Sequence, residues 1–196
     1  MRTALALVVA LGLVGTLQAE THRATNPWAR VRPMHARVEK LLSLGMDRSA
    51  TFRQLVRRIE ASDVIVYVEA RSDLRDDVGA SMRFMVKSPR DRYVRVQLNA
   101  RHNEPTLVAL LGHELQHVVE VAEHPEVGSP DELREFYRRL GLRTGPDSFD
   151  SAAARETGYL VRAELVRHGG LRMAQADAAR EQRLLDGGSI EAQGMQ

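Results

Sequence analysis

The chain has 196 residues, of which 43% are hydrophobic and 28% charged, proportions that exclude a disordered, collagen-like or polytopic membrane protein. It contains no cysteine, which excludes disulfides, thiolate nucleophiles and cysteine-based metal clusters. The formal net charge is only +2 and the basic residues form no long run, so the sequence does not support binding to nucleic acid.

The first segment predicts an export signal. Arg2 supplies a positive charge, the stretch from Leu5 to Leu17 is apolar, and the small residue Ala19 precedes the expected cleavage point. This apolar stretch is short for a membrane-spanning helix, which needs about 20 residues. We therefore expect a signal peptide over residues 1–19. The rest, residues 20–196, is expected to be a single exported domain, periplasmic or secreted, with no stable membrane insertion after cleavage.

Two helices are expected at the start of this domain. Residues 20–33 contain two prolines and predict an extended arm, and residues 34–44 then have helical character up to Gly45. Ser49 is a candidate N-cap for a second helix, whose apolar residues recur every three or four positions as far as Ala61.

Three strands are expected next, in a small antiparallel or mixed sheet. Residues 64–68 are a β-branched apolar run that is typical of a buried strand. Residues 82–87 and 94–99 alternate between apolar and polar side chains on either side of a turn at residues 88–91. This pattern predicts an antiparallel hairpin with one wetter face.

The remainder of the chain is expected to be helical. Residues 107–121 are apolar almost all the way round the helix, which is typical of a buried helix. Further helices are predicted over residues 129–140, 148–167 and 171–186. A Gly-Gly pair separates the last two, and the Gly-rich end at residues 187–196 is expected to fray. No internal repeat or linker is present, so we expect one α+β domain.

The buried helix contains an HExxH motif, His113-Glu114-Leu115-Gln116-His117. Histidines four residues apart share one face of a helix, so both imidazoles can bind the same Zn²⁺. Glu114 lies about 100° round the helix from His113, where it can act as a general base toward a metal-bound water. Burying three ionisable side chains in an otherwise apolar helix is costly unless they serve such a purpose.

This segment resembles the zincin metallopeptidases, whose fold places an HExxH helix beneath a small sheet. The resemblance is strongest over residues 92–123, where an alternating strand and a short loop precede the motif helix, and it extends loosely to residue 168. It implies a zinc-dependent peptidase that hydrolyses a peptide or protein substrate through a metal-activated water. It also implies that the strand Tyr93–Asn99 pairs with an extended substrate, backbone to backbone.

A catalytic zinc site of this kind needs a third protein ligand. The metzincin pattern HExxHxxGxxH is not present, because Glu120 and Glu123 stand where glycine and histidine are required and His124 comes one position late. The chain is more similar to the gluzincins, which place an acidic ligand on a later helix. The matching segment is FDSAAA at residues 149–154, where Asp150 replaces the usual glutamate.

Helical periodicity separates the acidic candidates on the later helix. If residues 148–167 form one helix, Asp150 lies on a small, largely apolar face that is expected to point inwards, whereas Glu156 lies about 120° away. Asp150 is the favoured third ligand and Glu156 is the main alternative. Glu120, Glu123 and His124, near the motif, are weaker candidates. Aspartate is one methylene shorter than glutamate, so the helices must approach closely, which the alanines allow. A competing interpretation is that Asp150 only stabilises the start of the helix.

Two other functions remain open at this stage. The domain could bind metal without peptidase activity, as a catalytically inactive zincin-like module of the cell envelope, or the HExxH pattern could be accidental in an interaction protein. Tyr137, Tyr159 and His168 could donate a hydrogen bond to an oxyanion, although packing or surface roles are favoured for each. The sequence indicates neither the oligomeric state nor the sequence preference toward a substrate.

Overall fold

The computed structural model of the protein describes residues 29–140, 142–143 and 149–187. The predicted signal peptide at residues 1–19 lies outside the described residues, as does nearly all of the end that is expected to fray. The elements in chain order are β1 (Val31–Pro33), α1 (Ala36–Arg48), α2 (Ala50–Glu60), β2 (Val64–Arg71), β3 (Ala80–Lys87), β4 (Arg92–Asn99), α3 (Glu104–Glu123), α4 (Pro130–Leu140), β5 (Leu142–Arg143), β6 (Phe149–Asp150) and α5 (Ala152–Gly187).

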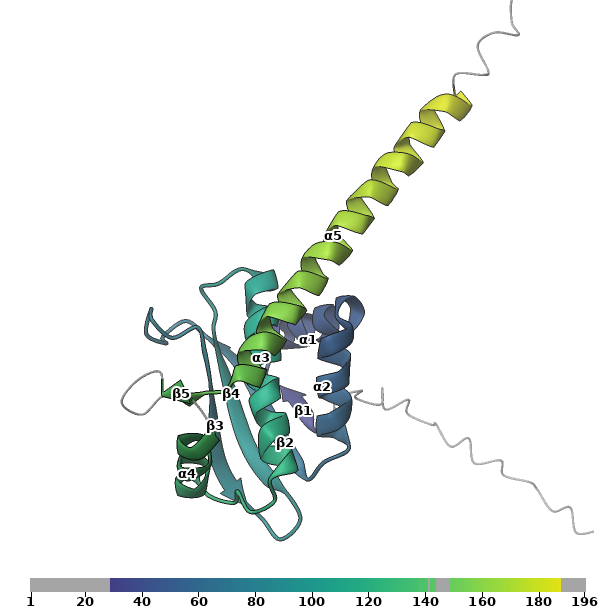
Figure 1. The fold of residues 1–196 in the computed structure, drawn as a ribbon. Helices are drawn as coiled ribbons and strands as arrows, with labels where there is room; N and C mark the ends of the chain where they lie inside the picture. Colours follow the sequence, from purple (N-terminus) through teal and green to yellow (C-terminus); the bar gives the residue numbers. More distant parts are fainter. Residues whose placement is uncertain (1–28, 141, 144–148, 188–196) are drawn as a thin grey trace, which may run out of the picture.

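The main sheet has four strands in the order β1-β2-β4-β3 (Figure 1). Strands β1, β2 and β4 run parallel to one another, whereas β3 pairs with β4 in the antiparallel direction. The predicted α+β class, mixed sheet and hairpin are therefore confirmed. The expected number of three strands is wrong, and β5 and β6 add a separate two-stranded pair.

The additional strand of the main sheet, β1, lies inside the stretch that was expected to be an extended arm. It has only three residues, pairs with β2, and is also held in place by a side chain. The carboxylate of Glu60, at the end of α2, accepts hydrogen bonds from the backbone N–H groups of Arg30 and Val31, each at 3.0 Å. Such a short strand carries no alternation that sequence reasoning could detect.

Helix α3 lies at the centre of the fold, between the sheet and the other long helix, α5 (Figure 1). It also contacts α1 and α2, so it is covered on most sides, as predicted for residues 107–121. Its buried polar side chains are Glu114, His117 and Glu120. Helix α4 lies beside β3, on the opposite side of the molecule from α1 and α2 (Figure 1).

The end of α1 differs from the prediction, whereas the start of α2 agrees with it. Helix α1 does not end at Gly45 but continues to Arg48, and the glycine packs directly against the ring of Phe52 on α2. Ser49 is the N-cap of α2 as expected, because its hydroxyl accepts a hydrogen bond from the backbone N–H of Phe52 at 2.9 Å.

The C-terminal helix is continuous, although two helices separated by Gly169 and Gly170 were expected. Helix α5 runs through both glycines and extends well beyond the rest of the domain (Figure 1). A glycine costs only about 1 kcal/mol in a helix interior, which is too little to end a long helix by itself. In the part of the chain that the structure describes, no helix is long and apolar enough to cross a membrane.

A buried arginine connects the sheet to the end of α3. Arg92 begins β4, is only 1% exposed, and forms a two-pronged ion pair with Asp63 at 2.7 and 2.8 Å. Its guanidinium also donates to backbone carbonyl oxygens at the end of α3 and beyond it, those of Val121, Ala122, His124 and Val127, at 2.7–3.3 Å. The carbonyls of Val121 and Ala122 belong to the last turn of α3, where the helix itself supplies no i→i+4 donor, so Arg92 caps the C-terminus of α3.

We expect Arg92→Met to lower the free energy of unfolding by about 2–4 kcal/mol, because it breaks the ion pair with Asp63 and removes the hydrogen bonds from the guanidinium to four carbonyl groups. Urea unfolding followed by circular dichroism measures the change. The matched control is Arg95→Met on the same strand, where the side chain is exposed and the expected change is below about 0.5 kcal/mol. Equal losses for the two variants would contradict the capping role.

Candidate metal centre

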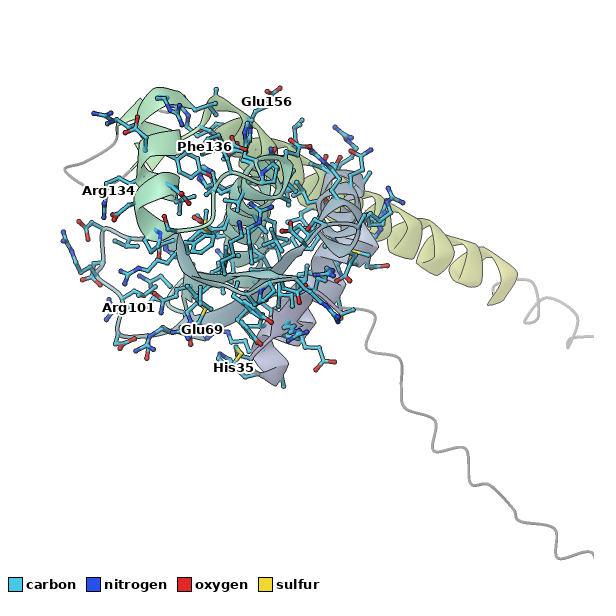
Figure 2. All side chains as sticks on the ribbon, turned by 90° about the horizontal axis from the view of Figure 1, so that it is seen from below. His35, Glu69, Arg101, Arg134, Phe136 and Glu156 are labelled. Atoms are coloured by element: carbon cyan, nitrogen blue, oxygen red, sulfur yellow. The ribbon has the colours of Figure 1, made fainter. Side chains whose placement is uncertain are left out.

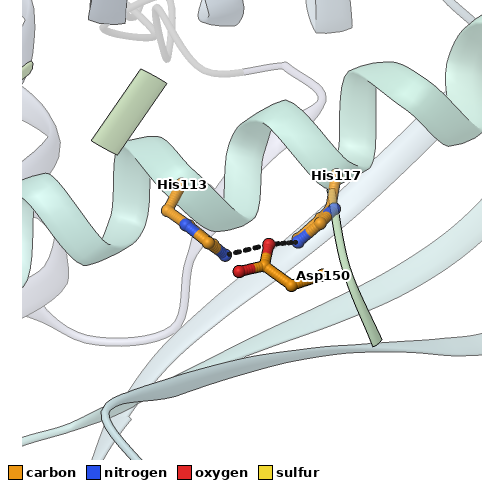
Figure 3. Close-up of side chains that lie close together, drawn as sticks. All are labelled: His113, His117 and Asp150. Carbon is orange, nitrogen blue, oxygen red and sulfur yellow. Dashed lines mark ion pairs between the residues drawn. The ribbon is translucent and has the colours of Figure 1, made fainter. Parts of the chain in front are cut away.

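The structure brings together the three residues that the sequence predicts as metal ligands (Figure 3). The Nε2 atoms of His113 and His117 lie 3.3 and 3.4 Å from Oδ1 of Asp150. One ligand atom from each residue lies within 4.8 Å of the other two. Two imidazoles one helical turn apart therefore converge on one carboxylate from a distant part of the chain.

This arrangement can be compared with the geometry of a zinc site. In a tetrahedral site with bonds of about 2.0–2.1 Å, two ligand atoms lie about 3.3 Å apart. Both histidine–Asp150 distances match this edge of the tetrahedron, at 3.3 and 3.4 Å. Two histidines and one carboxylate also leave a fourth position open, as in catalytic zinc sites. The residues fit Zn²⁺, although this donor set suits other divalent transition metals as well.

Helices α3 and α5 approach closely because each has a glycine at the contact. A Cβ atom at Gly112 would lie 2.8 Å from the side chain of Val161, and one at Gly158 would lie 3.3 Å from Cβ of His113. The sequence predicts that the two helices approach closely, because aspartate is short, and the alanines at residues 152–154 were expected to allow this approach. Of those alanines, Ala154 is buried, whereas the two before it are exposed. The glycines therefore set the distance between the helices.

Asp150 lies in β6, just before α5, and not within the helix as predicted. The helix starts later because the hydroxyl of Ser151 accepts a hydrogen bond from the backbone N–H of Ala154 at 3.0 Å, which makes Ser151 the N-cap. The carboxylate of Asp150 faces the histidines, so it does more than stabilise the helix start. Thr157, Val161 and Leu165 are all buried, so the prediction that this face of the helix points inwards is confirmed at these residues.

The other candidate ligands lie away from this centre. Glu156 is exposed and points outward from α5 (Figure 2). Glu123 pairs with Arg58 on α2, and Nδ1 of His124 lies 2.8 Å from the carboxylate of its neighbour Glu126. Glu120 is near the centre, but it contacts Nδ1 of His117, the ring nitrogen that points away from Asp150.

Burial and neighbouring charges alter the proton affinity of the three clustered side chains. Burial lowers the pKa of His113, and the positive charge on His117 lowers it further. Burial acts the same way on His117, but hydrogen bonds with Asp150 and Glu120 outweigh it and raise the pKa to about 9. Burial raises the pKa of Asp150, yet the hydrogen bond with His117 and the charges of both histidines leave it below its ordinary value.

Glu114 lies next to the cluster and lines the same cavity. Its side chain is almost completely buried, and burial raises its pKa to about 7, although the positive charge of His117 opposes the shift. A carboxyl group with a pKa near neutral pH can both accept and donate a proton under physiological conditions. This property fits the role of general base that the HExxH spacing predicts for Glu114.

The cluster lies at the base of a cavity of about 860 Å³. One wall is formed by β3 and the loop before it, and the other by Pro130, Leu133, Arg134 and Tyr137 of α4. Of the suggested oxyanion donors, only Tyr137 lines this cavity, and its hydroxyl donates to Glu120 at 2.9 Å rather than into the open space. Tyr159 is 72% exposed.

The strand at the edge of this cavity is β3, not the predicted strand Tyr93–Asn99. Strand β4 pairs with β2 on one side and β3 on the other along its length, so its backbone cannot accept another strand. Asn99 donates its backbone N–H to the carbonyl of Gly79. Because hydrogen-bonded pairs alternate in an antiparallel ladder, the backbone groups of Ala80, Met82 and Phe84 point to the free edge of β3. Sequence alternation shows the faces of a strand but not its position in the sheet.

Comparison with protein-family models, curated proteins and solved structures finds no match to this chain.

We expect the purified protein to bind one equivalent of Zn²⁺. Asp150→Ala and His113→Ala should each weaken binding by more than about 100-fold, because losing a ligand costs more than the roughly 10–100-fold loss of an outer contact. Competition with a chromophoric chelator measures the affinity. The matched control is Glu156→Ala, which should bind zinc as tightly as the unaltered protein. A loss in the Glu156 variant instead would place the third ligand there.

Proposed function

We propose that this protein is an exported zinc-dependent peptidase that hydrolyses peptide bonds. The observation that carries the proposal is the convergence of His113, His117 and Asp150 beside Glu114, at the base of an open cavity. The predicted signal peptide supports export, and the resemblance of the HExxH segment to the zincins supports an amide substrate. Zinc is proposed as the metal because the donor set and distances fit its tetrahedral geometry.

The proposed chemistry divides the work among the residues of the site. When bound by the two histidines and Asp150, Zn²⁺ lowers the pKa of a coordinated water toward about 7 and polarises a substrate carbonyl. Glu114 would accept a proton from the attacking water and would later donate it to the leaving amine. The burial of Glu114 supports this double role, because it raises the pKa of the carboxyl group to about 7.

The free edge of β3 is the proposed docking site for the substrate backbone. An extended peptide can add to an exposed sheet edge through main-chain hydrogen bonds, which gives affinity with little sequence preference. Ala80, Met82 and Phe84 all line the cavity that also contains Glu114 and the three candidate metal ligands. A peptide paired with them would pass over the metal centre between β3 and α4.

A second candidate function is metal binding without hydrolysis, in a module of the cell envelope. One observation favours it: the hydroxyl of Tyr137 is committed to Glu120 and does not face the cavity. Among the described cavity residues, no other tyrosine is present to stabilise an oxyanion. Zinc binding by the unaltered protein without cleavage of casein or a peptide library would favour this function.

Glu114→Gln should reduce casein hydrolysis by at least about 100-fold while zinc binding is retained, because the amide cannot accept the proton from the water. Hydrolysis is measured with fluorescently labelled casein, and zinc content by atomic absorption. The exposed Glu156→Gln is the control and should remain active. Activity that survives Glu114→Gln would rule out the proposed mechanism.

Met82→Pro should raise the KM for a peptide substrate about tenfold, because it removes one backbone N–H at the free edge, a loss of about 1.4 kcal/mol. Proline is tolerated there because this N–H does not bond to β4. Met82→Ala is the matched control, since it removes the side chain but keeps the N–H. Steady-state kinetics with a fluorogenic peptide measures both variants. Equal KM values for the two would argue against strand addition at β3.

A further inference from the structure

A second carboxylate lies behind the metal centre, on the far side of His117. Glu120 is one turn further along α3, is only 7% exposed, and contacts three different elements. Its Oε2 accepts hydrogen bonds from Nδ1 of His117 at 2.8 Å and from the hydroxyl of Tyr137 at 2.9 Å. Its Oε1 accepts from the hydroxyl of Ser151 at 2.5 Å. One buried side chain therefore links α3, α4 and the start of α5.

We propose that Glu120 is a positioning residue that orients two of the three metal ligands, His117 directly and Asp150 through Ser151. The proposal rests on the metal site proposed above, and it assigns Glu120 a role distinct from that of a ligand. A carboxylate that holds the second nitrogen of a metal-binding histidine raises its basicity and fixes the orientation of the ring.

The contact with His117 determines which ring nitrogen carries the proton when the ring is neutral, as it is in a metal-binding histidine. An ionised carboxylate can only accept hydrogen bonds, so Nδ1 of His117 must be the donor at 2.8 Å. In the neutral form that binds a metal, Nε2 then carries the lone pair, and this is the nitrogen that faces Asp150. The rings of Tyr137 and His117 also meet edge to face, with their centres 5.1 Å apart, which restricts rotation of the imidazole.

The contact with Ser151 connects Glu120 to the third ligand. The Ser151 hydroxyl donates to Glu120 and at the same time accepts from the backbone N–H of Ala154 at 3.0 Å. The backbone N–H of Ser151 donates to Oδ1 of Asp150 at 2.7 Å. Displacing the Ser151 hydroxyl would therefore move the N-cap of α5 and the neighbouring carboxylate that faces the histidines.

The two histidines are held differently as a result. His117 has partners on both ring nitrogens, Asp150 on one side and Glu120 on the other. For His113, the residues that the structure describes provide a contact at Nε2 but no hydrogen bond at Nδ1. Nδ1 of His113 instead lies on the side of Gly158. Loss of Glu120 should therefore affect the two rings unequally, which a probe of each imidazole can detect.

Glu120→Gln tests the proposal with little change in shape. An amide has one accepting oxygen where the carboxylate has two, so it cannot satisfy three donors in the same way. We expect Zn²⁺ affinity, measured by chelator competition, to fall about 10–100-fold. In the metal-free protein at a pH well above the His117 pKa of about 9, where the ring is neutral, ¹⁵N NMR should show His117 protonated at Nδ1 before the substitution and a mixture of tautomers after it. The signal of His113 should change little.

Glu123→Gln is the matched control, because Glu123 lies three residues further along the same helix and its side chain is 56% exposed. It should alter neither the zinc affinity nor the His117 spectrum. If Glu120→Gln folds and leaves either the zinc affinity or the His117 tautomer unchanged, the positioning role is overturned. If the unaltered protein binds no zinc at all, the proposed metal site fails instead, and the tautomer measurement still reports on the Glu120 contact.

Two milder variants cover the case in which Glu120→Gln does not fold. Tyr137→Phe removes a hydroxyl that donates to Glu120 and lies 3.0 Å from Nδ1 of His117, and Ser151→Ala removes a hydroxyl that donates to Glu120 and caps α5; both leave the carboxylate in place. Each should weaken zinc binding about threefold to tenfold, the range for one net hydrogen bond. The double variant should lose less than the product of the two single losses if both act through Glu120. Unchanged affinity in both single variants would overturn the proposal.

Discussion

Burial of ionisable side chains in a central helix is the constraint that organises this protein. Helix α3 is covered by the sheet and by three other helices, and it still carries Glu114, His117 and Glu120 in its buried surface. Such groups are tolerated only where partners or a metal compensate the loss of water. The partners come from β6, α4 and the start of α5. Contacts with the ionisable side chains of α3 therefore help to position these elements, which come later in the sequence.

The sheet has a corresponding role in holding that helix. Arg92 joins the start of β4 to the end of α3, because its guanidinium pairs with Asp63 and also donates to carbonyl groups in the last turn of α3 and just beyond it. Strand β4 pairs with β2 on one side and β3 on the other, so Arg92 fixes the end of α3 to an interior strand of the sheet. The edge strand β3 is then left as one wall of the cavity, opposite α4.

The sequence was sufficient for features that depend on local periodicity or fixed spacing. It predicted the buried helix, the Ser49 cap, the β3–β4 hairpin and the meeting of His113 and His117 with Asp150. It was insufficient where a distant contact decides the structure. The short strand β1 depends on pairing with β2 and on Glu60, the start of α5 depends on the Ser151 cap, and the position of β4 inside the sheet depends on its parallel pairing with β2. The network at Glu120 was missed for the same reason, since its three partners come from separate elements.

The separation of the ligands along the chain has a thermodynamic consequence. His117 and Asp150 lie at the two ends of a stretch that includes all of α4, and a cation held by both would close that stretch into a ring. In the unfolded chain such a ring costs conformational entropy that increases only slowly with its length. Binding to the native state alone would therefore draw α4 and the start of α5 onto α3, and the added stability would grow with the logarithm of the free metal concentration.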